Sequence, residues 1–289
     1  MAGRLIRMVM DIGRVVCLNG EYLSAAEAAV PAGDGAVLYG MGLFETIKVS
    51  GGRPVVPERH LARLFRSAGE LGLSVPFGPG KLEEMVYETA AKNKMEGGGL
   101  RMTLTAGEGG SGPSVVIRAR TNPYVDENYI KGVSAVFAGH RRNETSPLVR
   151  HKTLNYWENI LARRAAMEGG YSEALFINIS GNLAEGSASN IFIISGGRVS
   201  TPDVESGLLP GITRQRVIEA CRDMDLQAEE RKVRPEELAG ADEAFLTSAL
   251  MGVMPLVRIG GENIGGGVPG KVTRLIMENG VFCRPRGGK

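Results

Sequence analysis

The sequence predicts an α+β protein with a small N-terminal α/β domain and a larger C-terminal α/β domain. Runs in which apolar residues alternate and runs in which they recur at helical spacing occur on both sides of one polar segment, 121–128. This segment breaks the periodicity, so we place the small domain at residues 1–121, the interdomain linker at 122–129 and the larger domain at 130–289. A chain of 289 residues is long enough for two such cores.

The small domain opens with a predicted hairpin over Arg14–Tyr22, because Asn19-Gly20 is a strong signal for a tight turn between two strands. The helix expected from Pro57 has Leu61, Leu64 and Ala68 on one face. The other expected elements are strands at 43–49 and 53–56, a helix over 81–94 and paired strands at 100–105 and 114–120.

The larger domain alternates strands and helices. A helix is predicted over Thr153–Met167 because Trp157, Ile160, Leu161 and Ala165 recur at helical spacing, and Lys152 then stands at its start. The other expected elements are strands at 132–138, 173–179, 190–194 and 243–247 and helices at 212–223 and 271–278.

The composition argues against several classes of protein. A formal charge of +2, with 34 scattered basic residues, does not indicate a nucleic-acid partner. No apolar run approaches the length of a membrane span, and Met1–Met10 has too few apolar residues for a signal sequence. The widely spaced Cys17, Cys221 and Cys283 predict neither a disulfide framework nor a metal site, so a cytoplasmic location is expected.

One lysine, one glutamate and one turn carry the candidate chemistry. Glu185 lies beside a run of small residues, Gly186–Ser189, which lets a flat ligand approach the backbone. The segment Gly207–Arg214 is a Gly/Pro turn that runs into a helix, whose free N–H groups face an anion, and Thr213 adds a hydroxyl. Together with the Lys152 amine these groups match the needs of pyridoxal phosphate (PLP), so PLP is the predicted cofactor and no metal is expected.

Six motifs support this reading and occur in one order along the chain. They are Y-G-M-G-L-F-E-T (39–46), R-H-L-A-R-L (59–64), H-K-T-L-N-Y (151–156), E-G-S-A-S-N-I-F (185–192), L-L-P-G-I-T-R (208–214) and A-D-E-A-F-L-T-S-A-L-M-G-V-M-P (241–255). With them the chain resembles the fold-type IV PLP enzymes, which include branched-chain aminotransferases, D-amino-acid aminotransferases and 4-amino-4-deoxychorismate lyases. The resemblance implies that the larger domain is a pseudo-barrel, that the cofactor binds between the domains and that the protein is a homodimer.

The resemblance also implies a role for each matching residue. Lys152 would bind PLP covalently, and Glu185 would bind its ring nitrogen. Arg63 would bind the phosphate with its guanidinium fork, Leu209 would pack on the ring and Tyr156 would hydrogen-bond near Lys152. The remaining cofactor-binding residues would be Gly211, Ile212, Thr213, Thr247 and Ser248. Each of these positions also has an ordinary structural reading, as a surface charge, a turn residue or a core side chain.

Three local features favour a lyase over an aminotransferase. The run Ala249–Pro255 resembles the lyases, whereas aminotransferases usually have a threonine-containing run there. Thr46 falls where the lyases carry a proton-relaying threonine, although a β-branched strand residue fits equally well. The segment 106–113 lacks the Arg-x-His carboxylate trap of typical D-amino-acid aminotransferases. Two features depart from the family pattern, Ala106 in place of an arginine and Glu45, which is more usual in aminotransferases.

The predicted reaction is the conversion of 4-amino-4-deoxychorismate to 4-aminobenzoate and pyruvate, a step of folate synthesis. Lys152 would act as the general base and Thr46 would help to protonate the leaving group. The alternative is a class IV aminotransferase that acts on D-amino acids or branched-chain L-amino acids with a 2-keto acid acceptor. A PLP-binding protein without turnover is a third possibility. In either enzyme the partner is a small amine and carboxylate substrate, and the arginine that binds its carboxylate stays open among Arg101, Arg118, Arg141, Arg142 and Arg150.

Overall fold

The computed structural model describes residues 15–107 and 112–279. The chain divides into two compact units, Met1–Asn122 and Pro123–Lys289. Part of the segment predicted as a linker is helical, because Asp126–Lys131 forms α4. Arg14, Met1–Met10, Cys283 and residues 108–111 of the run 106–113, all of which enter the sequence predictions, lie outside the described residues.

The first unit contains a six-stranded antiparallel sheet in the order β2-β1-β6-β5-β3-β4. The hairpin of the first two strands is confirmed, and its turn residues Asn19 and Gly20 have positive φ angles of 51° and 91°, as this tight turn requires. The strands are β1 (Val15–Leu18), β2 (Glu21–Ser24), β3 (Gly42–Ser50), β4 (Arg53–Pro54), β5 (Gly97–Thr105) and β6 (Val115–Arg120). The helices are α1 (Gly35–Tyr39), α2 (Pro57–Glu70) and α3 (Pro79–Lys92).

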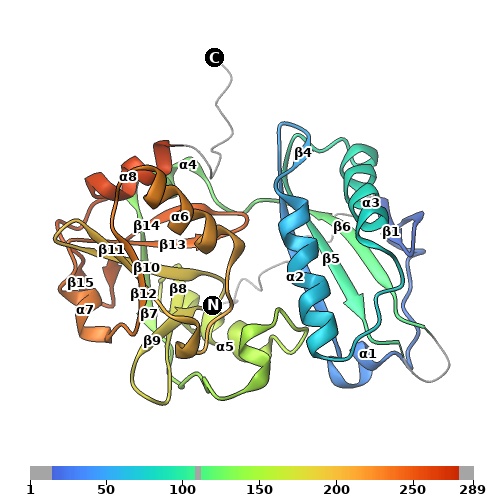
Figure 1. The fold of residues 1–289 in the computed structure, drawn as a ribbon, viewed down its shortest axis with the longest axis horizontal. Coiled ribbons are helices and arrows are strands. Elements are labelled where there is room, and N and C mark those ends of the chain that lie inside the picture. Colours follow the sequence, from blue (N-terminus) through green and yellow to red (C-terminus); the bar gives the residue numbers. More distant parts are fainter. Residues whose placement is uncertain (1–14, 108–111, 280–289) are drawn as a thin grey trace, which may run out of the picture. The chain divides into compact units, whose positions relative to one another are not determined.

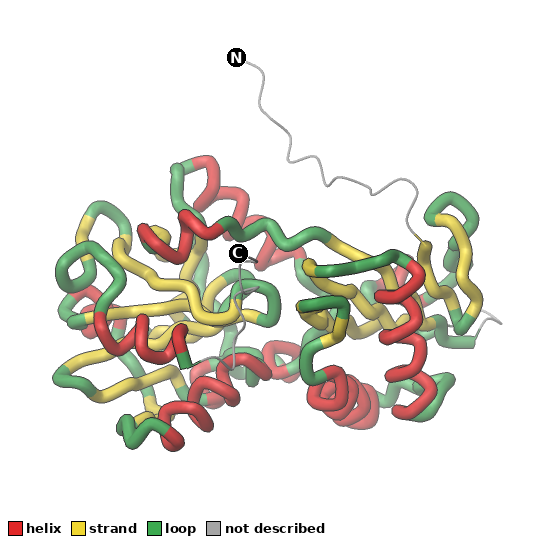
Figure 2. Tube along the Cα trace, turned by 90° about the horizontal axis from the view of Figure 1, so that it is seen from above, coloured by secondary structure: helices red, strands yellow, loops and turns green. Residues whose placement is uncertain are grey.

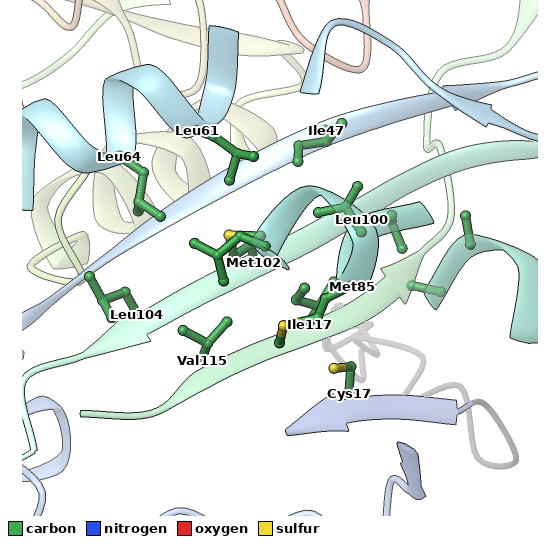
Figure 3. Packing of buried hydrophobic residues seen from close by; sticks show 14 of the residues in the cluster. Cys17, Ile47, Leu61, Leu64, Met85, Leu100, Met102, Leu104, Val115 and Ile117 are labelled. Atoms are coloured by element: carbon green, nitrogen blue, oxygen red, sulfur yellow. The ribbon is translucent and has the colours of Figure 1, made fainter. Parts of the chain in front are cut away.

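Helices α2 and α3 pack on the sheet and close the core of the first unit (Figure 1). Figure 3 shows Leu61 and Leu64 of α2 above Met102 of the sheet, with Ile47 beside Leu61, in the cluster of buried side chains. Since side chains alternate along a strand, Leu43, Ile47 and their neighbours at odd positions of β3 face this core. The predicted apolar face of α2 is thereby confirmed.

One charged residue, Glu45, lies on the same core-facing side of β3. Its carboxylate receives two hydrogen bonds from Arg63 of α2, both at 2.7 Å, one from Nε and one from Nη2. His60 Nδ1 lies 2.7 Å from Glu45 Oε2, and all three side chains are buried. Burial alone would raise the pKa of Glu45, but the charge of Arg63 and the hydrogen bond from His60 hold it at about 2. This buried ion pair ties α2 to the sheet.

We expect Glu45→Gln to destabilise the first unit by about 3–5 kcal/mol at pH 7, because it removes the negative charge that receives two hydrogen bonds from the buried Arg63 guanidinium. The folded-state pKa of Glu45 is lowered, so its stabilisation is present above the ordinary carboxyl pKa of about 4.3 and is lost as the pH falls toward about 2. The difference between variant and parent should therefore shrink below pH 4. Urea unfolding followed by circular dichroism measures it.

Glu84→Gln is the matched control, because Glu84 pairs with Lys81 on the exposed surface of α3. It should change the free energy of unfolding by less than about 0.5 kcal/mol. Equal effects of the two substitutions would contradict the buried-pair account of Glu45.

The second unit is built on a nine-stranded mixed sheet in the order β12-β11-β10-β13-β14-β7-β8-β9, with β15 paired to β14. Its strands run through the middle of the unit, with helices and loops around them (Figure 2). The strands are β7 (Val133–Phe137), β8 (Glu173–Ile177), β9 (Leu183–Gly186), β10 (Asn190–Ser195), β11 (Arg198–Pro202), β12 (Ala228–Arg231), β13 (Glu243–Ser248), β14 (Gly252–Ile259) and β15 (Glu262–Asn263). The helices are α4, α5 (Trp157–Glu168), α6 (Ile212–Asp223), α7 (Pro235–Ala239) and α8 (Lys271–Glu278), with short 3₁₀ turns η1 (Pro147–Arg150) and η2 (Val204–Ser206).

Both faces of this sheet are covered, so its central strands are apolar on both sides. Along β10, Ile191 and Ile193 pack in one cluster of buried residues, while Phe192 and Ile194 pack in another beneath α6 and α8. Phe192 stacks on Phe245 of the neighbouring β13 with ring centroids 4.7 Å apart. This continuous packing fixes β10 and β13, whose ends carry several of the candidate site residues.

The predicted start of helix α5 was wrong, and the apolar residues that predicted the helix do not form its buried face. The helix begins at Trp157 rather than Thr153, and its buried residues are Asn159, Ala162 and Ala166. Trp157 is 63% exposed and Leu161 is 45% exposed. The helical period was read correctly, but the large apolar side chains lie on the side that points away from the unit's own core. The predicted bounds of α6 and α8 are confirmed.

Candidate active site

Lys152 lies in the loop between η1 and α5, five residues before the helix that it was expected to open. Its side chain is half-buried, and its Nζ lies 5.6 Å from the centroid of the Tyr156 ring. Burial raises the pKa of Glu185, and the positive charge of Lys152 is one of the influences that oppose this rise. The structure therefore brings together Lys152, Tyr156 and Glu185, the three residues that the sequence predicts at the cofactor ring.

The segment that precedes Lys152 is anchored at two points. Glu144 accepts hydrogen bonds from the backbone N–H groups of Ile179, at 3.0 Å, and Ser180, at 2.9 Å. Arg150 Nη2 lies 2.6 Å from Glu205 Oε2. Burial would raise the pKa of Glu144, but these hydrogen bonds, with that of the Ser180 hydroxyl, hold it at about 2. The ionised Glu144 carboxylate and the Arg150–Glu205 ion pair therefore hold this segment in place although it has little regular structure.

Glu185 is a buried carboxylate on strand β9, a strand that the sequence did not predict. Its Oε2 accepts the backbone N–H of Leu209 at 3.0 Å, and its Oε1 lies 3.5 Å from Arg142 Nη2. Burial raises the pKa of Glu185 to about 7, against the opposing effects of Arg142, Leu209 and Lys152. Near neutral pH this carboxyl group therefore changes its charge easily, which suits a partner for a ring nitrogen.

Tyr156 is held by the loop that follows Glu185. Its hydroxyl donates a 2.9 Å hydrogen bond to the backbone carbonyl of Ser187, which also accepts the side-chain amide of Asn159 at 2.9 Å. Burial, together with the negative charges of Glu185 and Glu173, raises the pKa of Tyr156. Tyr156 is therefore a neutral phenol at physiological pH, and its role beside Lys152 stays a prediction.

A second buried carboxylate, Glu173 of β8, accepts hydrogen bonds from the loop that follows Glu185. It accepts hydrogen bonds from the hydroxyls of Ser187 and Ser189 and from the backbone N–H groups of Ser187 and Ala188. Gly186 is required here, because a Cβ at this position would lie 2.2 Å from Ser189 Oγ. The small residues between Glu185 and Asn190 thus serve a buried polar network as well as a close approach to the backbone.

The start of α6 has the features of an anion site. The first N–H groups of any α-helix lack an intrahelical partner, and the N-cap of α6 is Gly211, which has no side chain to accept hydrogen bonds from them. A Cβ on Gly211 would lie 2.0 Å from Asn190 Oδ1, and Asn190 Nδ2 donates to the Leu209 carbonyl at 2.8 Å. Asn190 is also the cross-strand partner of Thr247. Leu209, Gly211 and Thr247 therefore lie around one side chain, Asn190, which the sequence analysis did not select, and Ile212 and Thr213 follow in the first turn of α6.

Thr247 supplies a test of whether this place fits a phosphate. Its side-chain oxygen is buried and has no hydrogen-bond partner among the described residues. A buried hydroxyl is normally satisfied, so an unpartnered one beside free helix N–H groups fits an anionic ligand. Ser248, next to it, accepts the Met251 N–H at 3.4 Å, and its role at the phosphate stays a prediction. Among the described residues no group of three or more His, Cys, Asp or Glu side chains is placed to hold a metal ion.

Arg63 and Thr46 belong to the first unit and lie on opposite faces of β3. On the core side of β3, Arg63 is paired with the carboxylate of Glu45, which also contacts His60. The sequence analysis predicted neither contact. The signal was present, since His60 and Arg63 stand three residues apart on one helix and so share a face. Thr46 is half-buried on the other face, opposite Arg101 of β5. A role of Arg63 at the phosphate and of Thr46 at the substrate stays a prediction.

Comparison with known proteins identifies the family. A family model described as amino-transferase class IV matches residues 42–259, and the chain belongs to this family. The enzymes of this family depend on PLP, and this chain is a PLP-dependent enzyme with the two-domain, fold-type IV architecture. No helix in the described part of the chain is long and apolar enough to cross a membrane.

Three relatives show how the family resemblance is distributed. The chain is 32% identical over 270 residues to the D-alanine aminotransferase of Bacillus licheniformis, covering 91% of this chain and 94% of the relative. It is 29% identical over 259 residues to the aminodeoxychorismate lyase of Bacillus subtilis, covering 87% and 88%. Among solved structures, the branched-chain amino acid aminotransferase of Escherichia coli superposes with a TM-score of 0.87 at 26% identity, covering 92% of both chains.

We expect Thr247→Val to weaken PLP binding about tenfold or more, because a hydrogen bond to a charged oxygen contributes about 1.5–3 kcal/mol. The same change should leave the unfolding temperature of the cofactor-free protein unchanged or slightly higher, since it removes a buried hydroxyl that lacks a partner. PLP titration by absorbance and thermal unfolding without PLP measure the two effects. Thr247→Ser, which keeps the hydroxyl, is the control, and an unchanged affinity in Thr247→Val would contradict the site.

Proposed function

We propose that this protein is a lyase that converts 4-amino-4-deoxychorismate to 4-aminobenzoate and pyruvate in folate synthesis. The observation that carries this choice is the position of Ala249. It lies two residues after Thr247, in the turn that follows β13, and therefore beside the proposed phosphate site. Aminotransferases of the resembling group usually have a threonine-containing run here. The buried Leu250 and Met251 that follow give this turn an apolar character instead.

The residues of the second unit divide the work at the cofactor. When bound, PLP supplies an electron sink for the carbon that carries the substrate amino group. Lys152 holds the cofactor and then serves as the general base that removes the C4 proton of the substrate. Glu185 stabilises the protonated ring nitrogen. Loss of this proton and of the enolpyruvyl group, which leaves as pyruvate once protonated, produces the aromatic ring of 4-aminobenzoate.

Thr46 of the first unit is the proposed proton donor to the leaving group. Its half-buried hydroxyl lies on the face of β3 away from α2. Glu45, the neighbouring residue that is more usual in aminotransferases, points to the other face and is held by Arg63 and His60. Glu45 is therefore accounted for by the core of the first unit, and its presence does not weigh against a lyase.

The second candidate is a class IV aminotransferase with a 2-keto acid acceptor. It is favoured by the relatives, because the D-alanine aminotransferase of Bacillus licheniformis, at 32% identity, is more similar than the aminodeoxychorismate lyase of Bacillus subtilis, at 29%. A putative branched-chain-amino-acid aminotransferase of Methanocaldococcus jannaschii is also 29% identical, over 282 residues. In this reaction Lys152 would also remove the substrate proton but would then transfer it to the cofactor, and no group would leave the substrate.

The PLP-loaded protein should release 4-aminobenzoate and pyruvate in equal amounts from 4-amino-4-deoxychorismate. Fluorescence of 4-aminobenzoate and a coupled lactate dehydrogenase assay measure the two products. If neither product forms while a D- or L-amino acid reacts with the bound PLP and a keto acid reverses the change, the aminotransferase is correct and the lyase is not.

Two variants separate the roles in this assay. Lys152→Ala should abolish turnover in either reaction, and turnover retained in this variant would contradict the assigned base. Thr46→Val should lower the rate of pyruvate release by about 10²-fold or more, the range for general acid catalysis, with little change in PLP binding. Thr46→Ser keeps the hydroxyl and should retain most of the rate.

We also propose that the enzyme is a homodimer and that α5 lies at or near the interface. Trp157, Ile160 and Leu161 form an exposed apolar stripe along this helix, with Leu148 of η1 also exposed. A stripe of this kind marks a surface that is covered in the assembled protein. Sedimentation velocity should give twice the mass of the chain, and Trp157→Glu with Leu161→Glu should shift the protein to the monomer. Leu275→Glu on α8, also an exposed leucine, should leave the dimer intact.

A further inference from the structure

Arg142 is a loop residue whose guanidinium lies next to the Glu185 carboxylate, and it is almost fully buried. Its backbone is fixed by a bridge to Asn178, with its N–H on the Ile177 carbonyl at 2.9 Å. Its guanidinium stacks on the Phe176 ring, with Cζ 3.9 Å from the ring centroid. Among the described residues its Nε has no hydrogen-bond partner. A buried arginine held this firmly has a fixed charge and cannot swing toward solvent.

The guanidinium is shared between two carboxylates of unequal exposure. Nη1 lies 2.5 Å from Oε2 of Glu158, a half-exposed residue of α5, and 3.3 Å from Asn159 Oδ1. Nη2 lies 3.5 Å from Oε1 of the buried Glu185. Arg142 is therefore bonded closely to the outer carboxylate and only loosely to the inner one.

We propose that Arg142 is a positioning residue that keeps Glu185 ionised for the ring nitrogen of the cofactor, and that Glu158 sets how strongly it does so. This inference rests on the proposed role of Glu185. The other charged or titratable groups that act on Glu185 are Lys152 from the same loop, Tyr156 at the start of α5 and Glu173 from β8. On its exposed side, Glu158 also contacts a histidine, since His140 Nε2 lies 3.6 Å from Glu158 Oε1.

The arrangement predicts opposite effects for the two members of one ion pair. Removing the Arg142 charge takes away the main opposing influence on Glu185, so the carboxyl should become harder to ionise. Removing the Glu158 charge leaves Arg142 with Glu185 as its main negative partner, so the carboxyl should become easier to ionise. A purely structural role for the pair would disturb the site in the same direction in both variants.

The test is a carbon-13 NMR titration of the glutamate carboxyl groups in the cofactor-free protein from about pH 5 to about pH 11, which covers the rise expected below. The Glu185 signal is assigned by its loss in Glu185→Gln. In Arg142→Met the midpoint should rise by about 1–3 pH units, the range for loss of a neighbouring opposite charge. In Glu158→Gln it should fall by roughly half a unit, because the lost charge is half-exposed and screened. A midpoint that does not move in Arg142→Met, or that rises in Glu158→Gln, overturns the proposal.

Two controls remove the same kind of charge at a nearby residue that does not contact Glu185, and a third keeps the positive charge at position 142. Arg141→Met alters the exposed neighbour of Arg142, and Glu168→Gln alters an exposed residue at the end of α5, so neither should move the midpoint. Arg142→Lys keeps the charge and should stay closer to the parent than Arg142→Met. If Arg142→Met does not fold, the fall in Glu158→Gln still decides the matter.

Cofactor binding separates this inference from the proposed function. The dissociation constant for PLP should be raised more at pH 7 than at pH 9 in Arg142→Met, and the loss in Glu185→Gln should be similar at both. If the midpoints shift as expected but Glu185→Gln binds PLP as well as the parent, Glu185 is not the acid of the cofactor, and the cofactor half of the proposal is wrong.

Discussion

Each unit contains a buried carboxylate, and the number and closeness of its hydrogen-bond and ionic partners determine whether that carboxylate is charged. Glu45 and Glu185 are both buried, yet the pKa of Glu45 is held at about 2 while that of Glu185 is raised to about 7. Glu45 has three contacts of 2.7 Å from Arg63 and His60. Glu185 has one backbone N–H at 3.0 Å and one guanidinium at 3.5 Å. A buried glutamate is thus ionised at neutral pH in the first unit, whereas the buried glutamate of the second unit titrates near neutral pH.

The partial compensation of Glu185 explains why so much of the second unit converges on it. Leu209 comes from the turn before α6, Arg142 and Lys152 from the loop before α5, and Glu173 from β8. The pairing of β8 with β9 brings Glu173 near Glu185, and the bridge from Arg142 to Asn178 holds the start of the loop beside the end of β8. The clamps of that loop, Glu144 on the Ile179–Ser180 turn and Arg150 on Glu205, then keep the lysine in register with the acid.

The sequence was sufficient where the signal was local. Helix α6, the Asn19-Gly20 hairpin and the apolar face of α2 each follow from turn chemistry or helical spacing within a few residues. It was insufficient where partners are distant. Strand β9 was not predicted, Asn190 and His60 were given no role, and Arg142 was only one of five candidates for the substrate carboxylate, because their contacts lie on other elements. Helix α5 shows a third kind of limit. Its period identifies a helix, but a period cannot say whether an apolar stripe faces its own core.

The phosphate site and the Glu185 site share one physical property, which is that each is incomplete without a ligand. Thr247 keeps a buried hydroxyl without a partner among the described residues, α6 begins at a glycine that provides no cap, and Glu185 is buried with less positive charge than it needs. Each unsatisfied buried group costs about 1–3 kcal/mol in the empty protein. A ligand with a phosphate at one end and a protonated ring nitrogen at the other would remove these costs together. Binding of such a ligand should therefore be strongly coupled to the stability of the second unit, and the same incompleteness is what makes the site selective for it.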